Sequence, residues 1–118
     1  MASIMIADDS DAIRLVLKDI LELGQHTVAG EAVNGQEAIE KFSELKPELL
    51  LLDLAMPKKD GFTVVKEIMK TNPDAKIILI TAADDQKIIN QCLDAGAKAY
   101  ISKPFEFDNV LKVISKTI

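Results

Sequence analysis

The sequence has few of the residues that mark disulfide-stabilised, membrane-spanning or basic nucleic-acid-binding proteins. Its one cysteine, Cys92, cannot form a disulfide within the chain, which favours a reducing cytoplasm. No apolar run approaches the roughly 20 residues that span a bilayer. The opening MASIMIADDS lacks the basic and apolar regions of a signal peptide. We therefore expect a cytoplasmic protein with no membrane partner.

The charge pattern argues against direct nucleic-acid binding. The formal net charge is −5 and no run of Lys or Arg forms a basic stripe. Hydrophobic residues make up 48% and charged residues 28%, the balance of a globular rather than a disordered chain. At 118 residues we expect one domain over 1–118 with no output domain. Nothing in the sequence demands a dimer, so we expect a monomer.

Short apolar runs alternate with longer amphipathic ones along the whole chain. Nearly continuous apolarity is typical of strands that helices cover on both faces. A more mixed run contains Gly30 and is expected at a sheet edge. The alternation predicts an α/β fold of the (βα)5 type with a parallel sheet. The expected strands cover residues 3–7, 26–33 (the mixed run), 48–53, 76–81 and 98–102.

The segments between the expected strands have helical spacing of apolar residues. Gly24 is a C-terminal cap for the first helix, and Asn34 followed by Glu37 resembles a capping box for the second. We expect Asp60 and Asp84 to be N-terminal caps for the third and fourth. The apolar stripes, in helix order, are Ile13, Val16, Leu17, Ile20 and Leu21; Ala38, Ile39 and Phe42; Val64, Val65, Ile68 and Met69; Ile88, Ile89, Cys92 and Leu93; and Phe107, Val110, Leu111, Ile114 and Ile118.

Polar residues gather where the expected strands end. Asp8 and Asp9 follow the first strand, Asp53 and Thr81 end the third and fourth, and Lys103 follows the fifth. In doubly wound sheets, ligands bind beyond these carboxyl ends. Two carboxylates about 4 Å apart repel by roughly 4 kcal/mol at an effective dielectric near 20, so the cluster needs shifted pKa values or a cation. Mg²⁺ fits, because it takes carboxylate and phosphate oxygens.

The same residue types suit phosphoryl transfer. A metal-anchored carboxylate is a nucleophile towards phosphorus and forms an acyl phosphate. The charge that develops on the phosphoryl oxygens needs cationic and hydroxyl partners, for which Lys103 and Thr81 are the candidates.

Four motifs give the chain a specific resemblance to response-regulator receiver domains, and most of all to chemotaxis regulators of the CheY type. The resemblance covers the whole chain. It implies a flavodoxin-like, doubly wound sheet of strand order 2-1-3-4-5. The motifs, in order, are IADDS, LLLLDLAMPKKDG, ILITA and YISKPF.

The resemblance also implies a site. Asp53 would be phosphorylated from the phosphohistidine of a histidine kinase such as the chemotaxis kinase. Asp9 and Asp53 would bind Mg²⁺ directly, Asp8 through water, and Ala55 through its main-chain carbonyl. Such a protein is a phosphoacceptor that assists its own phosphorylation and dephosphorylation rather than an enzyme.

The resemblance further implies a switch. Lys103 would pair with Asp53 and then with the phosphoryl group. The peptide bond between Lys103 and Pro104 would be cis. Thr81 would move towards the phosphoryl oxygens and Tyr100 would rotate inward behind it. The fourth helix, fifth strand and fifth helix would then bind a downstream motility or adaptor protein. Candidate contacts on that face are Lys87, Gln91, Lys98, Tyr100 and Lys112; candidates for docking the kinase or its phosphotransfer domain are Asp11, Ile13 and Arg14.

Two alternatives stay open beside this interpretation. One is a phosphorelay intermediate that passes the group to another histidine. The other is a phosphatase of the haloacid dehalogenase kind, although the second Asp of that family's Asp-x-Asp pattern would fall on Ala55. A nucleotide-binding loop is excluded, because the first turn, ADDSDA, has no glycine.

Overall fold

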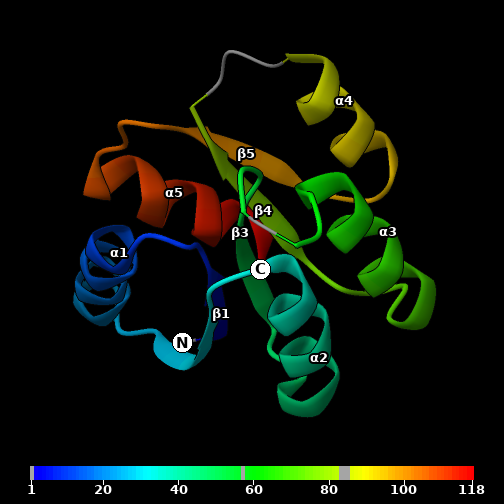
Figure 1. Ribbon diagram of the computed structural model, residues 1–118. Coiled ribbons are helices and arrows are strands. Elements are labelled where there is room, and N and C mark those ends of the chain that lie inside the picture. Colours follow the sequence, from blue (N-terminus) through cyan, green and yellow to red (C-terminus); the bar gives the residue numbers. More distant parts are fainter. Residues whose placement is uncertain (1, 57, 83–85) are drawn as a thin grey trace.

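Strands and helices alternate strictly along the chain (Figure 1). The computed structural model describes residues 2–56, 58–82 and 86–118. No helix in these ranges is both long and apolar enough to cross a membrane. The elements are β1 (Ser3–Ala7), α1 (Asp11–Leu23), β2 (Thr27–Ala32), α2 (Gly35–Leu45), β3 (Leu49–Asp53), α3 (Gly61–Thr71), β4 (Ile77–Thr81), α4 (Gln86–Asp94), β5 (Ala99–Ser102) and α5 (Phe107–Thr117).

The strands form one parallel sheet of order β2-β1-β3-β4-β5, which confirms the flavodoxin-like prediction. The expected strands are right in place and order, and differ from the observed ones by one residue at some ends. In the register, Ala7 of β1 faces Leu52 of β3, and Thr81 of β4 faces Ser102 of β5. The residues that follow β1 therefore lie beside Asp53, the last residue of β3.

Strand β2 lies at the sheet edge, as its mixed composition predicted. Its pairing with β1 shifts register between Ile4, which faces Val28, and Met5, which faces Gly30. One extra residue in an edge strand is a β-bulge, and such bulges often lie near functional sites. Beyond the bulge, Glu31 and Ala32 run beside the end of β1.

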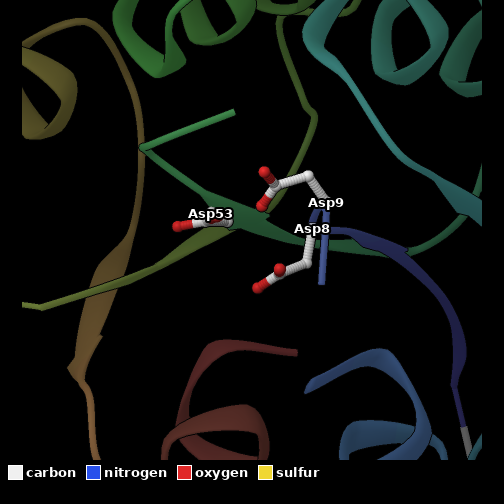
Figure 2. A group of neighbouring side chains, drawn as sticks. All are labelled: Asp8, Asp9 and Asp53. Carbon is white, nitrogen blue, oxygen red and sulfur yellow. The ribbon is translucent and has the colours of Figure 1, made fainter. Parts of the chain in front are cut away.

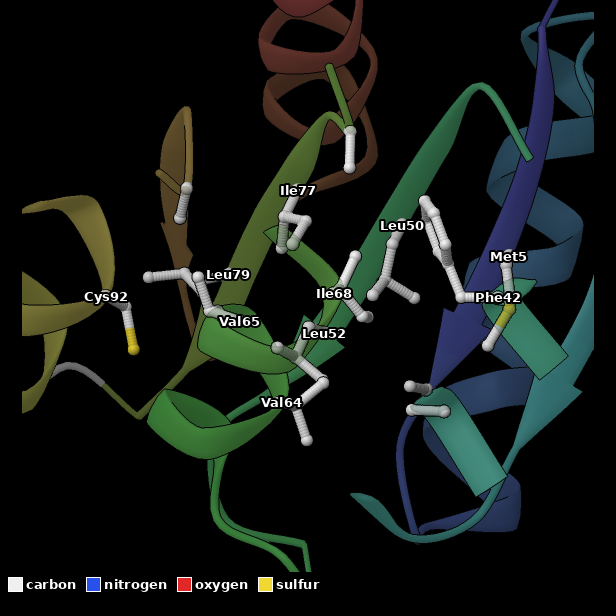
Figure 3. Close-up of a cluster of buried hydrophobic side chains, with 14 of the residues drawn as sticks. Met5, Phe42, Leu50, Leu52, Val64, Val65, Ile68, Ile77, Leu79 and Cys92 are labelled. Atoms are coloured by element: carbon white, nitrogen blue, oxygen red, sulfur yellow. The ribbon is translucent and has the colours of Figure 1, made fainter. Parts of the chain in front are cut away.

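Helices cover both faces of the sheet. Helices α1 and α5 lie on one side, and α2, α3 and α4 lie on the other (Figure 1). Successive strand residues point to opposite faces, so Leu50 and Leu52 pack in the cluster beneath α2, α3 and α4 (Figure 3), while Leu49 and Leu51 pack beneath α1 and α5. The two clusters make β3 fully buried.

Helix ends follow the capping residues where the structure describes them. The Asn34 side chain accepts a hydrogen bond from the Glu37 N–H at 2.8 Å, and Asp60 accepts one from Thr63 at 2.9 Å. Gly24 is the C-cap of α1. The predicted cap Asp84 lies outside the described residues.

Two of the predicted apolar helix stripes include residues that the sheet does not cover. In α5 the buried residues are Val110 and Ile114, whereas Phe107 and Ile118 are exposed. Both exposed residues lie at the helix ends, away from the turns that pack on the sheet. In α1, Val16 is also exposed, whereas Leu17, Ile20 and Leu21 are buried and Ile13 packs against the same cluster.

Candidate functional site

Three carboxylates meet at the carboxyl ends of β1 and β3 (Figure 2). One oxygen from each of Asp8, Asp9 and Asp53 lies within 4.8 Å of the other two. Asp8 is 1% and Asp53 5% exposed, whereas Asp9 faces solvent. The sheet order thus brings together carboxylates that the sequence separates by more than forty positions.

Lys103, just after β5, pairs with both buried carboxylates. Its Nζ lies 3.1 Å from Oδ2 of Asp8 and 3.4 Å from Oδ1 of Asp53. The main-chain N–H of Lys103 donates to the carbonyl of Thr81 at 2.6 Å, which anchors the residue beside β4. The Lys103–Pro104 peptide is cis, as the resemblance implied.

The ionisation of Asp53 is opposed by its surroundings. Burial raises the pKa of Asp53 above its ordinary value, and the charge of Asp8 raises it further. Lys103 and the N–H of Ala55, which donates to Oδ1 at 3.3 Å, act in the opposite direction without cancelling the shift. One ammonium does not fully balance the cluster, so a further cation would be bound favourably.

The backbone around Asp8 is held by several hydrogen bonds. Its side-chain Oδ1 accepts from the N–H of Ser10 at 2.8 Å, and its own N–H donates to the carbonyl of Ala32 in β2 at 3.0 Å. Sequence reasoning missed one more contact: Nη1 of Arg14 donates to the Asp8 carbonyl at 2.7 Å. An Arg one turn into the helix after the acidic loop is the only sequence signal for it.

Thr81 and Ala55 line one pocket beside the end of β3, together with Gly61 and Ile88. Thr81 is half-buried at the end of β4, and Ala55 is exposed after β3. Tyr100 faces Leu79 in the register of β4 and β5, and its side chain is 40% exposed. The structure therefore gathers Asp8, Asp9, Asp53 and Lys103 into the cluster, places Thr81 and Ala55 at its rim, and leaves Tyr100 turned to solvent.

The cluster fits the chemistry of a small divalent cation. All three candidate side chains are carboxylates, the hard oxygen donors that Mg²⁺ prefers. Asp9 is open to solvent, so a bound ion would keep water ligands and room for a phosphate oxygen. The donor set and its unbalanced charge agree with Mg²⁺ rather than with a closed structural metal site.

Comparison with known protein families assigns the chain to one of them. The receiver domain model of response regulators matches residues 4–115. The chain belongs to the response regulator receiver domain family. This match does not support the haloacid dehalogenase alternative.

Among relatives, the chain is similar to chemotaxis proteins named CheY. It is 43% identical to CheY of Thermotoga maritima, over 96% of this chain and 94% of that protein. It is 42% identical to CheY of Bacillus subtilis, over 98% of this chain and 96% of that protein. Among solved structures, CheY of Borrelia burgdorferi in a CheX–CheY–BeF3–Mg²⁺ complex has 30% identity and a TM-score of 0.93, over 97% of this chain and 87% of that one.

Proposed function

We propose that this chain is a CheY-like phosphoacceptor that takes a phosphoryl group on Asp53 from a histidine kinase, with Mg²⁺ bound beside it. The observation that carries the proposal is the buried Asp53 carboxylate, which lies within 4.8 Å of Asp8 and Asp9 and 3.4 Å from Lys103. The site residues proposed here are those that the sequence suggested.

The metal would be held by Asp9 and Asp53, by Asp8 through water, and by the main-chain carbonyl of Ala55. Bound Mg²⁺ supplies positive charge that offsets the carboxylates and the phosphoryl oxygens. The Borrelia burgdorferi relative, crystallised with Mg²⁺ and BeF3, supports this assignment.

In the proposed step, an Asp53 carboxylate oxygen attacks the phosphorus of the donor's phosphohistidine. The O–P bond to Asp53 forms while the N–P bond breaks, and the departing imidazole takes up a proton. Lys103, already 3.4 Å from Asp53, then pairs with the phosphoryl oxygens. The chain acts as acceptor and assists the transfer, and no turnover of a separate substrate is needed.

Phosphorylation is proposed to act on a switch through Thr81 and Tyr100. Thr81 lies at the rim of the site, where its hydroxyl could be drawn to the new phosphoryl oxygens. Tyr100, 40% exposed on the neighbouring strand, has solvent-facing area to lose by rotating inward. The face of α4, β5 and α5 would then bind a downstream protein, with motility control the output that the CheY relatives favour.

The test is phosphotransfer from an autophosphorylated chemotaxis histidine kinase. We expect label to leave the kinase and reach this chain within seconds in Mg²⁺, and to stay on the kinase in EDTA or with Asp53→Asn. Reverse transfer of the label to a second, purified phosphotransfer protein would indicate a phosphorelay intermediate instead. No transfer from any phosphohistidine donor would contradict the proposed function.

A further inference from the structure

Arg14, one turn into α1, is nearly buried, and its guanidinium bonds three separate acceptors. Nη1 donates to the Asp8 carbonyl at 2.7 Å, and Nε donates to Oε1 of Glu31 at 2.9 Å. Nη2 also pairs with the carboxylate of Asp11, and the Arg14 side chain is 11% exposed. These bonds engage the Arg14 guanidinium within the chain, which gives it a role beside the kinase docking that the sequence suggested.

The carbonyl that Arg14 holds belongs to the peptide joining Asp8 to Asp9. The N–H on the other side of Asp8 is bonded to Ala32 at 3.0 Å. Arg14 is itself bonded to Glu31, the neighbour of Ala32 in β2. The two peptides that flank Asp8 are therefore both anchored to the same edge strand, one directly and the other through the Arg14 guanidinium.

Glu31 holds Arg14 as an ionised partner. Its second oxygen, Oε2, accepts from Nζ of Lys18 at 3.0 Å. The hydrogen bond from Lys18 lowers the pKa of Glu31 most, burial raises it, and Arg14 lowers it further. Lys18 thus contacts the same carboxylate as Arg14. Among the described residues, no hydrogen bond joins Lys18 to the Asp8–Asp9 turn.

We infer that Arg14, oriented by Glu31, is a positioning residue that fixes the Asp8–Asp9 peptide and thereby sets the affinity of the site for Mg²⁺. The inference rests on the proposed function, because it assumes that the acidic cluster is the metal site. Groups that orient metal ligands without touching the metal typically change affinity about 10–100-fold when removed.

The sign of the effect separates positioning from simple electrostatics. Arg14 carries a positive charge close to the acidic loop, so by Coulomb's law alone its removal would strengthen cation binding. Positioning predicts the reverse, since a carbonyl released from Arg14 lets the Asp8–Asp9 turn rearrange. Lys18→Met removes the same charge from the same Glu31 and leaves the Asp8 carbonyl bond intact, so it is the matched control.

The experiment is calorimetric titration of the full chain with Mg²⁺, for native protein, Arg14→Met, Arg14→Lys and Lys18→Met, with thermal unfolding of each. We expect Arg14→Met to bind Mg²⁺ about 10-fold more weakly and Lys18→Met to stay within about 2-fold of native. Arg14→Lys keeps the charge but lacks the planar fork, so we expect about 3-fold weaker binding. If Arg14→Met does not fold, the affinity of Arg14→Lys for Mg²⁺ tests the inference in its place.

Native affinity in the Arg14 variants would overturn the inference and leave the proposed function standing. Equal weakening in Lys18→Met would overturn it as well, since the effect would then follow from disturbing Glu31 in general. Native protein that binds no Mg²⁺ would overturn the proposed function itself, and this inference with it.

Discussion

The ammonium group of Lys103, after β5, lies 3.4 Å from Oδ1 of Asp53, the last residue of β3. It also lies 3.1 Å from Oδ2 of Asp8 after β1, so one cation joins three strand ends. Without metal this ammonium is the only positive group whose ion pairs, among the described residues, reach the two buried carboxylates. Its removal and the removal of a carboxylate should therefore change stability in opposite directions.

Lys103→Met should destabilise the metal-free fold. Asp8 and Asp53 would be left buried without a cationic partner, and the pKa of Asp53 would rise further. Because Lys103 is partly exposed, we expect a loss of about 1–3 kcal/mol, between the values for exposed and buried pairs. The measurement is urea unfolding at neutral pH. The loss should shrink in acid, where the carboxylates are protonated.

The matched control for this variant is Lys59→Met. Lys59 pairs with Glu67 at 2.9 Å in a partly exposed ion pair, outside the acidic cluster. Such pairs contribute about 0–1 kcal/mol, so the control should unfold close to the native midpoint. Equal losses in both variants would show that Lys103 makes no special contribution to the cluster.

Asp53→Asn should stabilise the metal-free protein. Burial and Asp8 raise the pKa of Asp53 in the folded state, so folding is penalised wherever the unfolded carboxyl is ionised. The penalty begins near the unfolded pKa, grows as pH rises to the folded pKa, and is complete above it. We expect a gain in the free energy of unfolding at neutral pH that disappears at low pH. Unfolding measured across that pH range checks both the gain and its direction, and a destabilised mutant at neutral pH would contradict it.

Mg²⁺ should raise the thermal midpoint, and Asp9→Asn should remove most of that rise. At about 100 times its dissociation constant a ligand stabilises by roughly 2.7 kcal/mol, which is several degrees for a domain of this size. Asp9 is exposed, so its substitution should leave the metal-free midpoint nearly unchanged. Differential scanning calorimetry with and without Mg²⁺ measures this. Asp19→Asn, an equal charge change on α1, should keep the full shift; a full shift in Asp9→Asn would argue against its role as a ligand.

Gly35→Ala should disturb the loop that follows Asp53. A Cβ at Gly35 would lie 2.3 Å from the main-chain carbonyl oxygen of Lys59, which has little freedom to move. We expect a loss of about 1–3 kcal/mol in the free energy of unfolding. At Gly30 the nearest atom is the flexible end of Leu45, so Gly30→Ala is a milder control. Similar losses in the two variants, measured by urea unfolding, would contradict this account.

Much of the fold was predictable because strong local patterns agree with the tertiary structure. Continuous apolarity in β3 indicated a central strand, and the cap Asp60 marked the start of α3. The residues at the strand ends could be brought to one edge by the rule for parallel sheets. Which carboxylate Lys103 approaches more closely could not be predicted, since that depends on side-chain geometry across strands.

The hydrogen bonds of Arg14 also could not be predicted from the sequence. Its partner Glu31 lies seventeen positions away in an edge strand, and the register shift in β2 decides where that side chain lies. Periodicity likewise predicted a longer stripe in α5 than the sheet covers, because spacing shows which residues share a helix face and not how far the neighbouring layer extends. Phe107 and Ile118 are therefore exposed, although the spacing placed them in the stripe.

The most direct test of the account is labelling with acetyl phosphate in Mg²⁺, comparing native protein with Asp53→Asn. We expect an acid-stable, base-labile label on the native chain, lost in EDTA and absent from the mutant. Equal labelling of the two proteins would place the phosphoryl group elsewhere and contradict the central role of Asp53.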